Sequence, residues 1–234
     1  MNMNDIATNI AKIRSQIDTY ASNCGRDPAR IQLLAVSKTK PAEDIRAAYA
    51  AGQTAFGENY LQEALSKIGQ LQDLPLEWHF IGGIQSNKTR ALAENFDWVH
   101  TLASEKHARR LNDQRPDSQP ALNVCIQINV SGEASKGGIE PEEIMPLAQA
   151  IAEMPNLNLR GLMAIPAPTD DIDEQHQAFA RLAKMQQAMQ QAGIDTDTLS
   201  MGMSDDMQAA IEQGSTMVRI GTAIFGKRSA SLET

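Results

Sequence analysis

The spacing of the hydrophobic positions changes along the chain, and each change marks a different kind of element. Near the start, isoleucines recur at alternating gaps of four and three residues, at Ile6, Ile10, Ile13 and Ile17. This spacing places them on one face of a helix, expected over about residues 4–24. The next apolar segment, residues 31–36, is too short for a helix and apolar enough to be buried on both faces. It predicts a first β-strand.

Further short apolar segments follow, and stretches with helical spacing separate them. The strand candidates are residues 54–56, 78–81, 98–102, 122–130, 159–165, 199–203 and 217–220. With the first strand they make about eight strands alternating with helices, the order of an α/β fold of the (β/α)₈ TIM-barrel type. A doubly wound open sheet is the alternative. The barrel is favoured because no Gly-x-Gly-x-x-Gly turn follows the first strand.

The length of the chain fits one domain. The 234 residues are 42% hydrophobic, and single barrels of this type commonly exceed 200 residues. No repeat, low-complexity tract or linker divides the sequence. We therefore expect a single domain over residues 1–234, with the barrel over about residues 31–228.

The composition limits which binding partners and which cellular compartment are expected. The net charge of −8 argues against a nucleic acid or an anionic membrane as partner. The two cysteines, Cys24 and Cys125, have no spacing typical of a metal site or a disulfide framework. The sequence shows neither the pattern of a signal peptide nor an apolar run of membrane-spanning length. We expect a soluble, cytoplasmic protein without a metal site.

Polar residues that directly follow the strands are the candidates for chemistry, because the ligand site of such a barrel lies at these strand ends. Lys38 comes two residues after the first strand. An amine at this rim is suited to form a Schiff base with an aldehyde. The same position also fits an ordinary solvated loop lysine. The residues at the other strand ends are needed to choose between these interpretations.

The last two strand ends carry residues suited to an anion. Ser204 follows the seventh strand, where it can cap a helix and donate to an anion. After the eighth strand, Gly221 permits close approach of the backbone, and Thr222 supplies an N–H and a hydroxyl at a helix start. Arg219 adds a fixed positive charge. Closure of the barrel brings these residues to Lys38, which indicates a phosphorylated aldehyde; a Schiff-base aldolase acting on a sugar phosphate uses the same groups.

Two further strand ends are less informative. Ser86 and Asn87 follow the third strand and fit either a helix cap or a ligand contact. His79 alternates with Trp78 and Phe80 within that strand, so we expect a core histidine whose hydrogen bonds are satisfied.

Longer motifs surround these residues and run in order along nearly the whole chain. They are LAVSKTKP (34–41), FGENY (56–60), HFIG (79–82), QSNK (85–88), GLM (161–163), SMGMSDDM (200–207) and VRIGTAIFG (218–226). Together they resemble the YggS/PROSC family of pyridoxal 5′-phosphate (PLP) homeostasis proteins. The family usually has Pro-Leu after HFIG, and Gly83-Ile84 stands here instead, which affects the expected geometry of that loop more than cofactor binding.

The resemblance implies a barrel similar to the N-terminal domain of alanine racemase, with PLP as cofactor. It implies that Lys38 carries the cofactor as an imine and that Asn59 lies close to it. It also implies that Ser204, Gly221 and Thr222 hold the phosphate, and that Arg219 meets the pyridine nitrogen.

The expected role is binding and delivery of PLP without strong turnover, so no residue is assigned a catalytic role. A permanent charge at Arg219 disfavours protonation of the pyridine nitrogen and weakens the ring as an electron sink. A racemase also needs a second acid–base group, which alanine racemases take from a C-terminal domain of a partner subunit. Only eight residues follow Gly226. The alternatives are a PLP-dependent amino-acid racemase or a Schiff-base aldolase.

We expect a monomer that passes PLP transiently to apo-enzymes in the cell. Lys136, which is followed by two glycines, is expected to be an ordinary solvated lysine, and a role in PLP transfer or as a secondary PLP-binding residue is the alternative.

Overall fold

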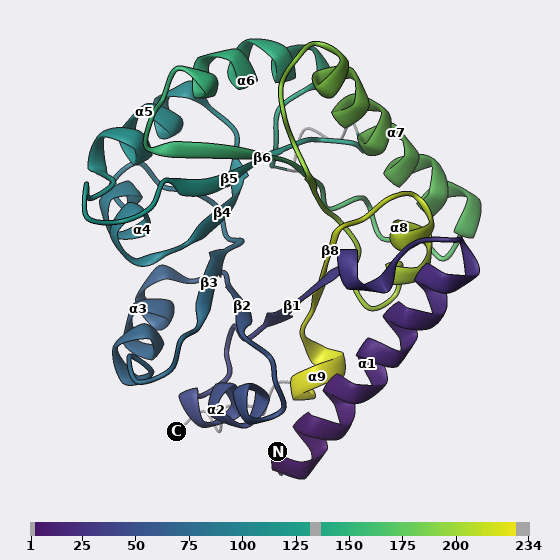
Figure 1. The fold of residues 1–234 in the computed structure, drawn as a ribbon. Helices are drawn as coiled ribbons and strands as arrows, with labels where there is room; N and C mark the ends of the chain where they lie inside the picture. Colours follow the sequence, from purple (N-terminus) through teal and green to yellow (C-terminus); the bar gives the residue numbers. More distant parts are fainter. Residues whose placement is uncertain (1–2, 132–136, 228–234) are drawn as a thin grey trace.

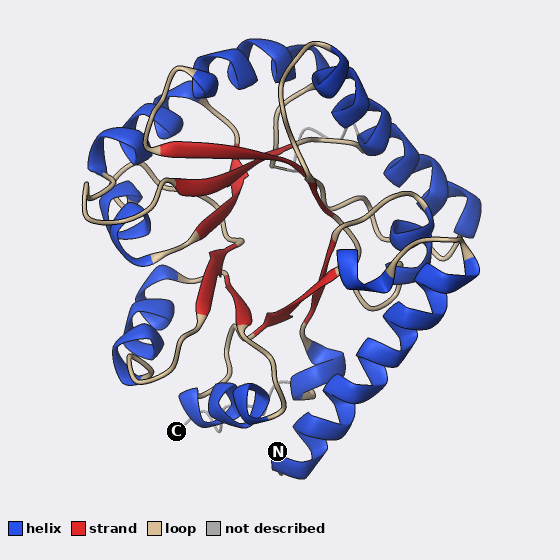
Figure 2. Ribbon diagram, viewed as in Figure 1, coloured by secondary structure: helices blue, strands red, loops and turns tan. Residues whose placement is uncertain are grey.

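The computed structural model describes residues 3–131 and 137–227, which form a closed barrel of parallel strands surrounded by helices (Figure 1). The strands follow one another around the barrel in sequence order, and β8 pairs with β1 to close it. The strands occupy the centre and the helices form the outer ring (Figure 2). The predicted (β/α)₈ fold is confirmed.

All eight predicted strands are present in the described residues. They are β1 Gln32–Val36, β2 Ala55–Glu58, β3 Glu77–Phe80, β4 Trp98–Leu102, β5 Leu122–Gln127, β6 Leu157–Met163, β7 Thr198–Ser200 and β8 Met217–Ile220. The bounds of most strands differ from expectation by one or more residues: β2 continues to Glu58, β5 ends at Gln127 rather than at position 130, β6 covers residues 157–163 rather than 159–165, and β7 ends at Ser200 rather than at position 203.

The helices fill the intervals between the strands. They are α1 Met3–Asn23, α2 Ala42–Ala50, α3 Leu61–Gln70, α4 Thr89–Asn95, α5 Glu105–Gln114, α6 Ile144–Ala152, α7 Ile172–Gln191, α8 Met207–Glu212 and α9 Thr222–Phe225, with short 3₁₀ turns η1 Pro28–Arg30 and η2 Pro141–Glu143. None of these described helices is both long and apolar enough to cross a membrane.

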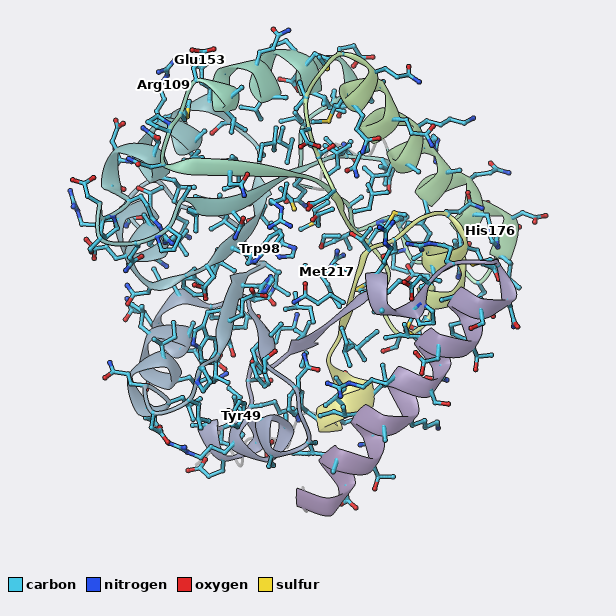
Figure 3. All side chains as sticks on the ribbon, in the orientation of Figure 1. Tyr49, Trp98, Arg109, Glu153, His176 and Met217 are labelled. Carbon is cyan, nitrogen blue, oxygen red and sulfur yellow. The ribbon has the colours of Figure 1, made fainter. Side chains whose placement is uncertain are left out.

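Successive side chains of each strand point to opposite faces of the barrel wall, which divides the buried side chains into two sets. The larger set packs between the strands and the helices. A smaller set fills the inside of the barrel and includes Trp98 and Met217, which point toward its centre (Figure 3). Because successive side chains of a strand point to opposite faces, Arg219 shares the inward face of Met217. A charged side chain therefore enters the barrel interior.

Helix α1 covers the closure of the barrel between its first and last strands. The four isoleucines that predicted it are all buried, with at most 5% exposure. The helix packs against α2, α8 and α9 (Figure 1). This packing holds α9, and with it the end of β8, beside the loop that follows β1.

Candidate active site: the Lys38 loop and the end of β8

Lys38 lies half-buried on the short loop between β1 and α2. It lines a hollow of about 90 Å³ together with Gly221 and Thr222. Lys40 ties this loop to the end of α9, because its Nζ donates to the backbone oxygens of Phe225 (3.0 Å), Gly226 (2.9 Å) and Lys227 (3.1 Å). The structure thus brings the end of β1 and the end of β8 together, as the sequence predicted.

The turn from β8 into α9 is held close to the end of β1. A Cβ atom on Gly221 would lie 3.2 Å from the carbonyl oxygen of Val36 and 3.3 Å from its Cβ. Thr222 is the first residue of α9, as predicted. The first N–H groups of a helix have no intrahelical acceptor and are suited to an anion. The absence of a side chain at Gly221 is what allows these donors to approach the hollow.

Arg219 is buried inside the barrel with only 4% exposure. It donates from Nη1 to Ser200 Oγ (2.8 Å) and from Nη2 to the backbone oxygen of Ala164 (3.0 Å). Within the described part of the chain, no carboxylate forms an ion pair with it. Burial lowers the pKa of Arg219 to about 10, so the guanidinium remains charged at neutral pH. A guanidinium has five N–H donors, and it therefore retains donors for a ligand.

A chain of hydrogen bonds connects Arg219 to the opposite end of the barrel. Ser200 Oγ lies 2.8 Å from His100 Nδ1, and His100 Nε2 lies 2.8 Å from His79 Nδ1. His79 Nε2 in turn contacts Glu77 Oε1 at 2.7 Å. Burial lowers the pKa of both histidines. His79 is thus a satisfied core histidine, which confirms the prediction.

Asn59 lies directly after β2, and its buried Oδ1 has no hydrogen-bond partner among the described residues. The backbone of Gly82 packs against it so closely that a Cβ there would lie 2.1 Å from the Asn59 carbonyl oxygen. The glycine that ends the HFIG motif is therefore required by this contact. An unpaired buried amide oxygen beside the site is a group that a ligand can satisfy.

Ser204 is exposed in the turn between β7 and α8. The expectation that it caps the following helix is wrong, because α8 begins at Met207 and Asp206 occupies the N-cap position. The Asp206 carboxylate instead accepts from the backbone N–H of Met203 (2.6 Å). The Ser204 hydroxyl makes no hydrogen bond to any described residue, which leaves it available to a ligand.

The interpretation of Ser86 or Asn87 as a helix cap is also wrong. Helix α4 begins at Thr89 with Lys88 at the N-cap position, and no side chain caps it. Ser86 Oγ lies 3.0 Å from His107 Nε2 instead. Lys136 falls outside the residues that the structure describes.

Sequence reasoning missed a group of charged residues behind the Lys38 loop. Lys67 on α3 is buried and contacts Glu58 and Glu63. The prediction ended the second strand before Glu58, which hid its position on the outward face of β2. A usable signal was the Glu63–Lys67 pair, four residues apart on a helix with the glutamate first.

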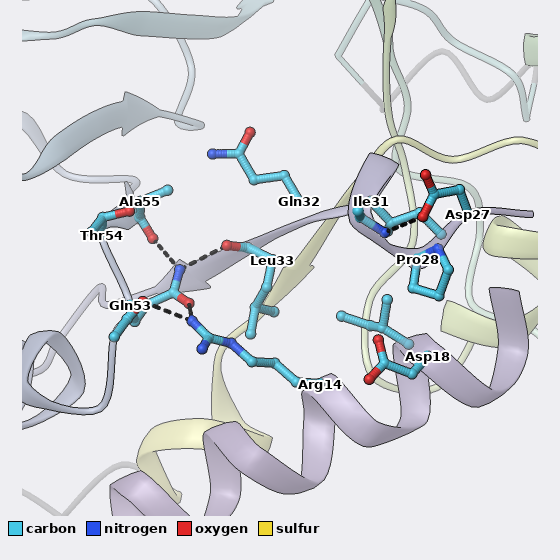
Figure 4. A pocket seen from close by; sticks show the side chains of 13 residues that line it. Arg14, Asp18, Asp27, Pro28, Ile31, Gln32, Leu33, Gln53, Thr54 and Ala55 are labelled. Carbon is cyan, nitrogen blue, oxygen red and sulfur yellow. Dashed lines mark hydrogen bonds between the residues drawn. The ribbon is translucent and has the colours of Figure 1, made fainter. Parts of the chain in front are cut away.

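Another hollow lies at the other end of the barrel, where the strands begin (Figure 4). It measures about 780 Å³ and is lined by α1 and the starts of β1 and β2. Arg14 donates there to the Gly52 carbonyl oxygen (2.8 Å) and to Gln53 Oε1 (3.2 Å). Gln53 Nε2 donates to the backbone oxygens of Leu33 and Ala55. These polar groups already satisfy one another.

The residues at the Lys38 end fit a phosphorylated aldehyde. An amine faces the small hollow, a glycine turn brings backbone donors to it, and a buried guanidinium and an unpaired amide oxygen lie at neighbouring strand ends. The strand pairing of β1 with β2 and β8 places these groups on one rim.

Comparison with known proteins identifies the family of the chain. The family model for the alanine racemase N-terminal domain matches residues 5–229. A protein of Pseudomonas aeruginosa named pyridoxal phosphate homeostasis protein is 59% identical over 226 residues, which are 97% of each chain. The solved structure of PipY of Synechococcus elongatus with PLP bound is 37% identical, with a TM-score of 0.83 over 94% of this chain and 100% of that one.

A more distant structural relative supports the fold alone. Alanine racemase of Corynebacterium glutamicum is 21% identical, with a TM-score of 0.69, and the match covers all of this chain but 64% of that one. The chain therefore belongs to the alanine racemase N-terminal domain family and, within it, to the pyridoxal phosphate homeostasis proteins.

Proposed function

We propose that this protein binds PLP covalently through Lys38 and acts in PLP homeostasis by buffering the cofactor and delivering it to other proteins. The observation that carries the proposal is the convergence of Lys38, Gly221 and Thr222 on one hollow, in a chain 59% identical to a pyridoxal phosphate homeostasis protein. Charge complementarity supports it, because the buried Arg219 lacks a carboxylate partner among the described residues.

The chemistry of attachment needs only the lysine. The Lys38 amine adds to the aldehyde carbon, a carbon–nitrogen double bond forms, and the carbonyl oxygen leaves as water, without oxidation or reduction. In the proposed arrangement Ser204, Gly221 and Thr222 donate to the phosphate oxygens. Asn59 lies beside the ring, and Arg219 donates to the pyridine nitrogen.

Arg219 is also the reason to propose that the protein binds PLP without using it for catalytic turnover. PLP supplies an electron sink for carbanion chemistry when its pyridine nitrogen is protonated. A guanidinium that stays charged at neutral pH, with its pKa lowered only to about 10, disfavours a second positive charge at that nitrogen. We therefore expect little racemase or aldolase activity.

The remaining parts of the proposal concern partners and location. We propose that one domain over the whole chain suffices for PLP binding, and that the protein acts as a cytoplasmic monomer. Apo forms of PLP-dependent enzymes are the proposed transient recipients, since an imine on a rim lysine is open to exchange with another amine.

The test is the absorption spectrum of the purified protein after incubation with PLP and desalting. We expect a visible imine band in the wild type, its loss in Lys38→Ala, and its retention in Lys12→Ala, which removes an exposed lysine on α1. A wild type that stays colourless with added PLP would refute cofactor binding. Robust amino-acid racemisation by the pure protein would refute the homeostasis role and favour the enzyme alternative.

A further inference from the structure

A buried ammonium group lies directly behind the Lys38 loop. Lys67 on α3 is only 4% exposed. Its Nζ donates to the backbone oxygen of Ser37 (2.7 Å), to Glu58 Oε1 (2.8 Å) and to Glu63 Oε1 (2.5 Å). An ammonium group has three donors, so all of them are used. None is left for a ligand.

The partners of Lys67 fix the backbone on both sides of Lys38. On the side before it, Lys67 binds the Ser37 carbonyl directly, and the Ser37 hydroxyl donates to Glu58 Oε1 (2.6 Å). On the side after it, the Thr39 N–H donates to Glu63 Oε1 (2.6 Å), the same oxygen that Lys67 binds. The residues that flank Lys38 are thus tied to one ammonium group.

The backbone at Thr39 shows that this loop is constrained. Its φ is +63°, and it is the one described residue other than glycine with a positive φ. This region is unfavourable for a β-branched residue, and such a conformation persists only where the surroundings enforce it. The hydrogen bond from Thr39 to Glu63 supplies that constraint beside the proposed ligand-binding lysine.

Stability alone does not account for the cluster. A buried ion pair is often no more stabilising than apolar residues of the same volume, because both charges lose their hydration. Here Glu58 is fully buried, and its Oε2 has no partner among the described residues. The hydrogen bonds of the cluster end on the backbone of Ser37 and Thr39, which belong to the same loop. This pattern indicates that the cluster fixes the conformation of the loop.

We propose that Lys67 is a positioning residue that, through Ser37, Glu58 and Glu63, holds the Lys38 amine toward the turn at Gly221. This inference rests on the proposed function, since it assumes that Lys38 forms the imine. Lys67 does not line the hollow itself. Its loss is therefore expected to impair imine formation and to spare the contacts that hold the phosphate.

The test compares PLP with pyridoxine 5′-phosphate, which carries an alcohol in place of the aldehyde, on wild type and Lys67→Met. We expect the variant to form the visible imine band with an affinity for PLP weaker by about tenfold to a hundredfold, the usual effect of a misplaced reacting group. Its affinity for pyridoxine 5′-phosphate should stay within about twofold of wild type, because the phosphate contacts are intact.

The matched control is Arg46→Met, which breaks the exposed ion pair between Arg46 and Asp73 and the bond to the Gln70 carbonyl in the same region of the fold. These groups make no contact with the Lys38 loop, so both affinities should be unchanged. Glu63→Ala is the second variant, in case Lys67→Met does not fold. It removes the bond to Thr39 from a partly exposed side chain, and we expect a smaller loss of the same selective kind.

The possible outcomes separate this inference from the proposed function. Unchanged PLP binding in Lys67→Met and Glu63→Ala would overturn the positioning role while leaving Lys38 as the imine residue. An equal loss for PLP and pyridoxine 5′-phosphate would also overturn it, since Lys67 would then support the whole site. A wild type without an imine band overturns the proposed function and this inference with it.

Discussion

The two ends of the barrel both carry polar side chains and a hollow, but they differ in what those side chains do. At the end where the strands begin, Arg14 and Gln53 bond to each other and to neighbouring backbone. At the end where the strands finish, Ser204 and Lys38 make no side-chain hydrogen bond to any described residue, and Arg219 carries a buried charge without a carboxylate. The side chains of Arg14 and Gln53 are thus satisfied at one end, whereas those of Ser204 and Lys38 are available at the other.

This difference shows that polar groups without hydrogen-bond partners are a better guide to a binding site than the volume of a hollow. The hollow at the satisfied end measures about 780 Å³, and the one that includes Lys38 about 90 Å³. Buried polar groups are normally hydrogen-bonded, so donors that lack partners mark the place where a ligand supplies them. By this criterion we propose the smaller hollow as the binding site.

The largest expected effect comes from filling the turn after β8. A valine at Gly221 would place its Cβ 3.2 Å from the Val36 carbonyl and extend further atoms into the hollow. We expect Gly221→Val to weaken PLP binding by about a hundredfold or more, equivalent to about 2.7 kcal/mol. Equilibrium dialysis would measure it. The control is Gly69→Val on α3, where an added Cβ would have no atom within 4 Å apart from its chain neighbours and the backbone of its own helix. Equal binding by both variants would contradict this prediction.

A smaller effect is expected on the pH dependence of stability, through the two histidines that link the two ends of the barrel. Burial lowers the pKa of His79 and His100 from the ordinary value of 6.5. The unfolded chain therefore binds more protons than the folded one as pH falls through about 6.5, and the free energy of unfolding should fall with it. Each histidine contributes at most about 1.4 kcal/mol per pH unit.

Chemical denaturation of wild type and His100→Gln between about pH 7 and pH 5.5 tests this link. The comparison of the two proteins cancels the opposite contribution of Glu58, whose pKa burial raises. Wild type should lose stability more steeply toward acid than the variant. Parallel pH profiles would mean that His100 is not held neutral in the interior.

The smallest effect is expected at the satisfied end. Arg14→Ala removes two hydrogen bonds that line the large hollow. Each such bond contributes about 1 kcal/mol, so we expect a modest loss of stability by thermal denaturation. PLP affinity should stay within about twofold of wild type. A marked loss of PLP binding would break the distinction between the two ends.

Much of the fold could be predicted because its signals are local. Short apolar runs gave all eight strands, and the four isoleucines gave α1. The error at Ser204 has a physical reason: an N-cap depends on where the first helical turn forms, and Ser, Asp and Asp at positions 204–206 are all good candidates. In the structure α8 begins only after Asp206, and the Asp206 carboxylate accepts from the Met203 N–H that precedes the helix rather than from a helical N–H.

The site was predictable only in part. Lys38, Gly221 and Thr222 each follow a predicted strand, and closure of the barrel is enough to bring them together. Lys67 and Glu58 gave no such signal, since their contact arises where the outward face of β2 meets α3. A period-two pattern does not reveal which outward residue a neighbouring helix will bury.

The most direct test of the central claim is to load the protein with PLP, reduce it with borohydride, and map the modified peptide by mass spectrometry. The account predicts a single phosphopyridoxyl group on Lys38, at the end of the barrel where the polar groups lack partners. Modification of a different lysine, or of none, would contradict it.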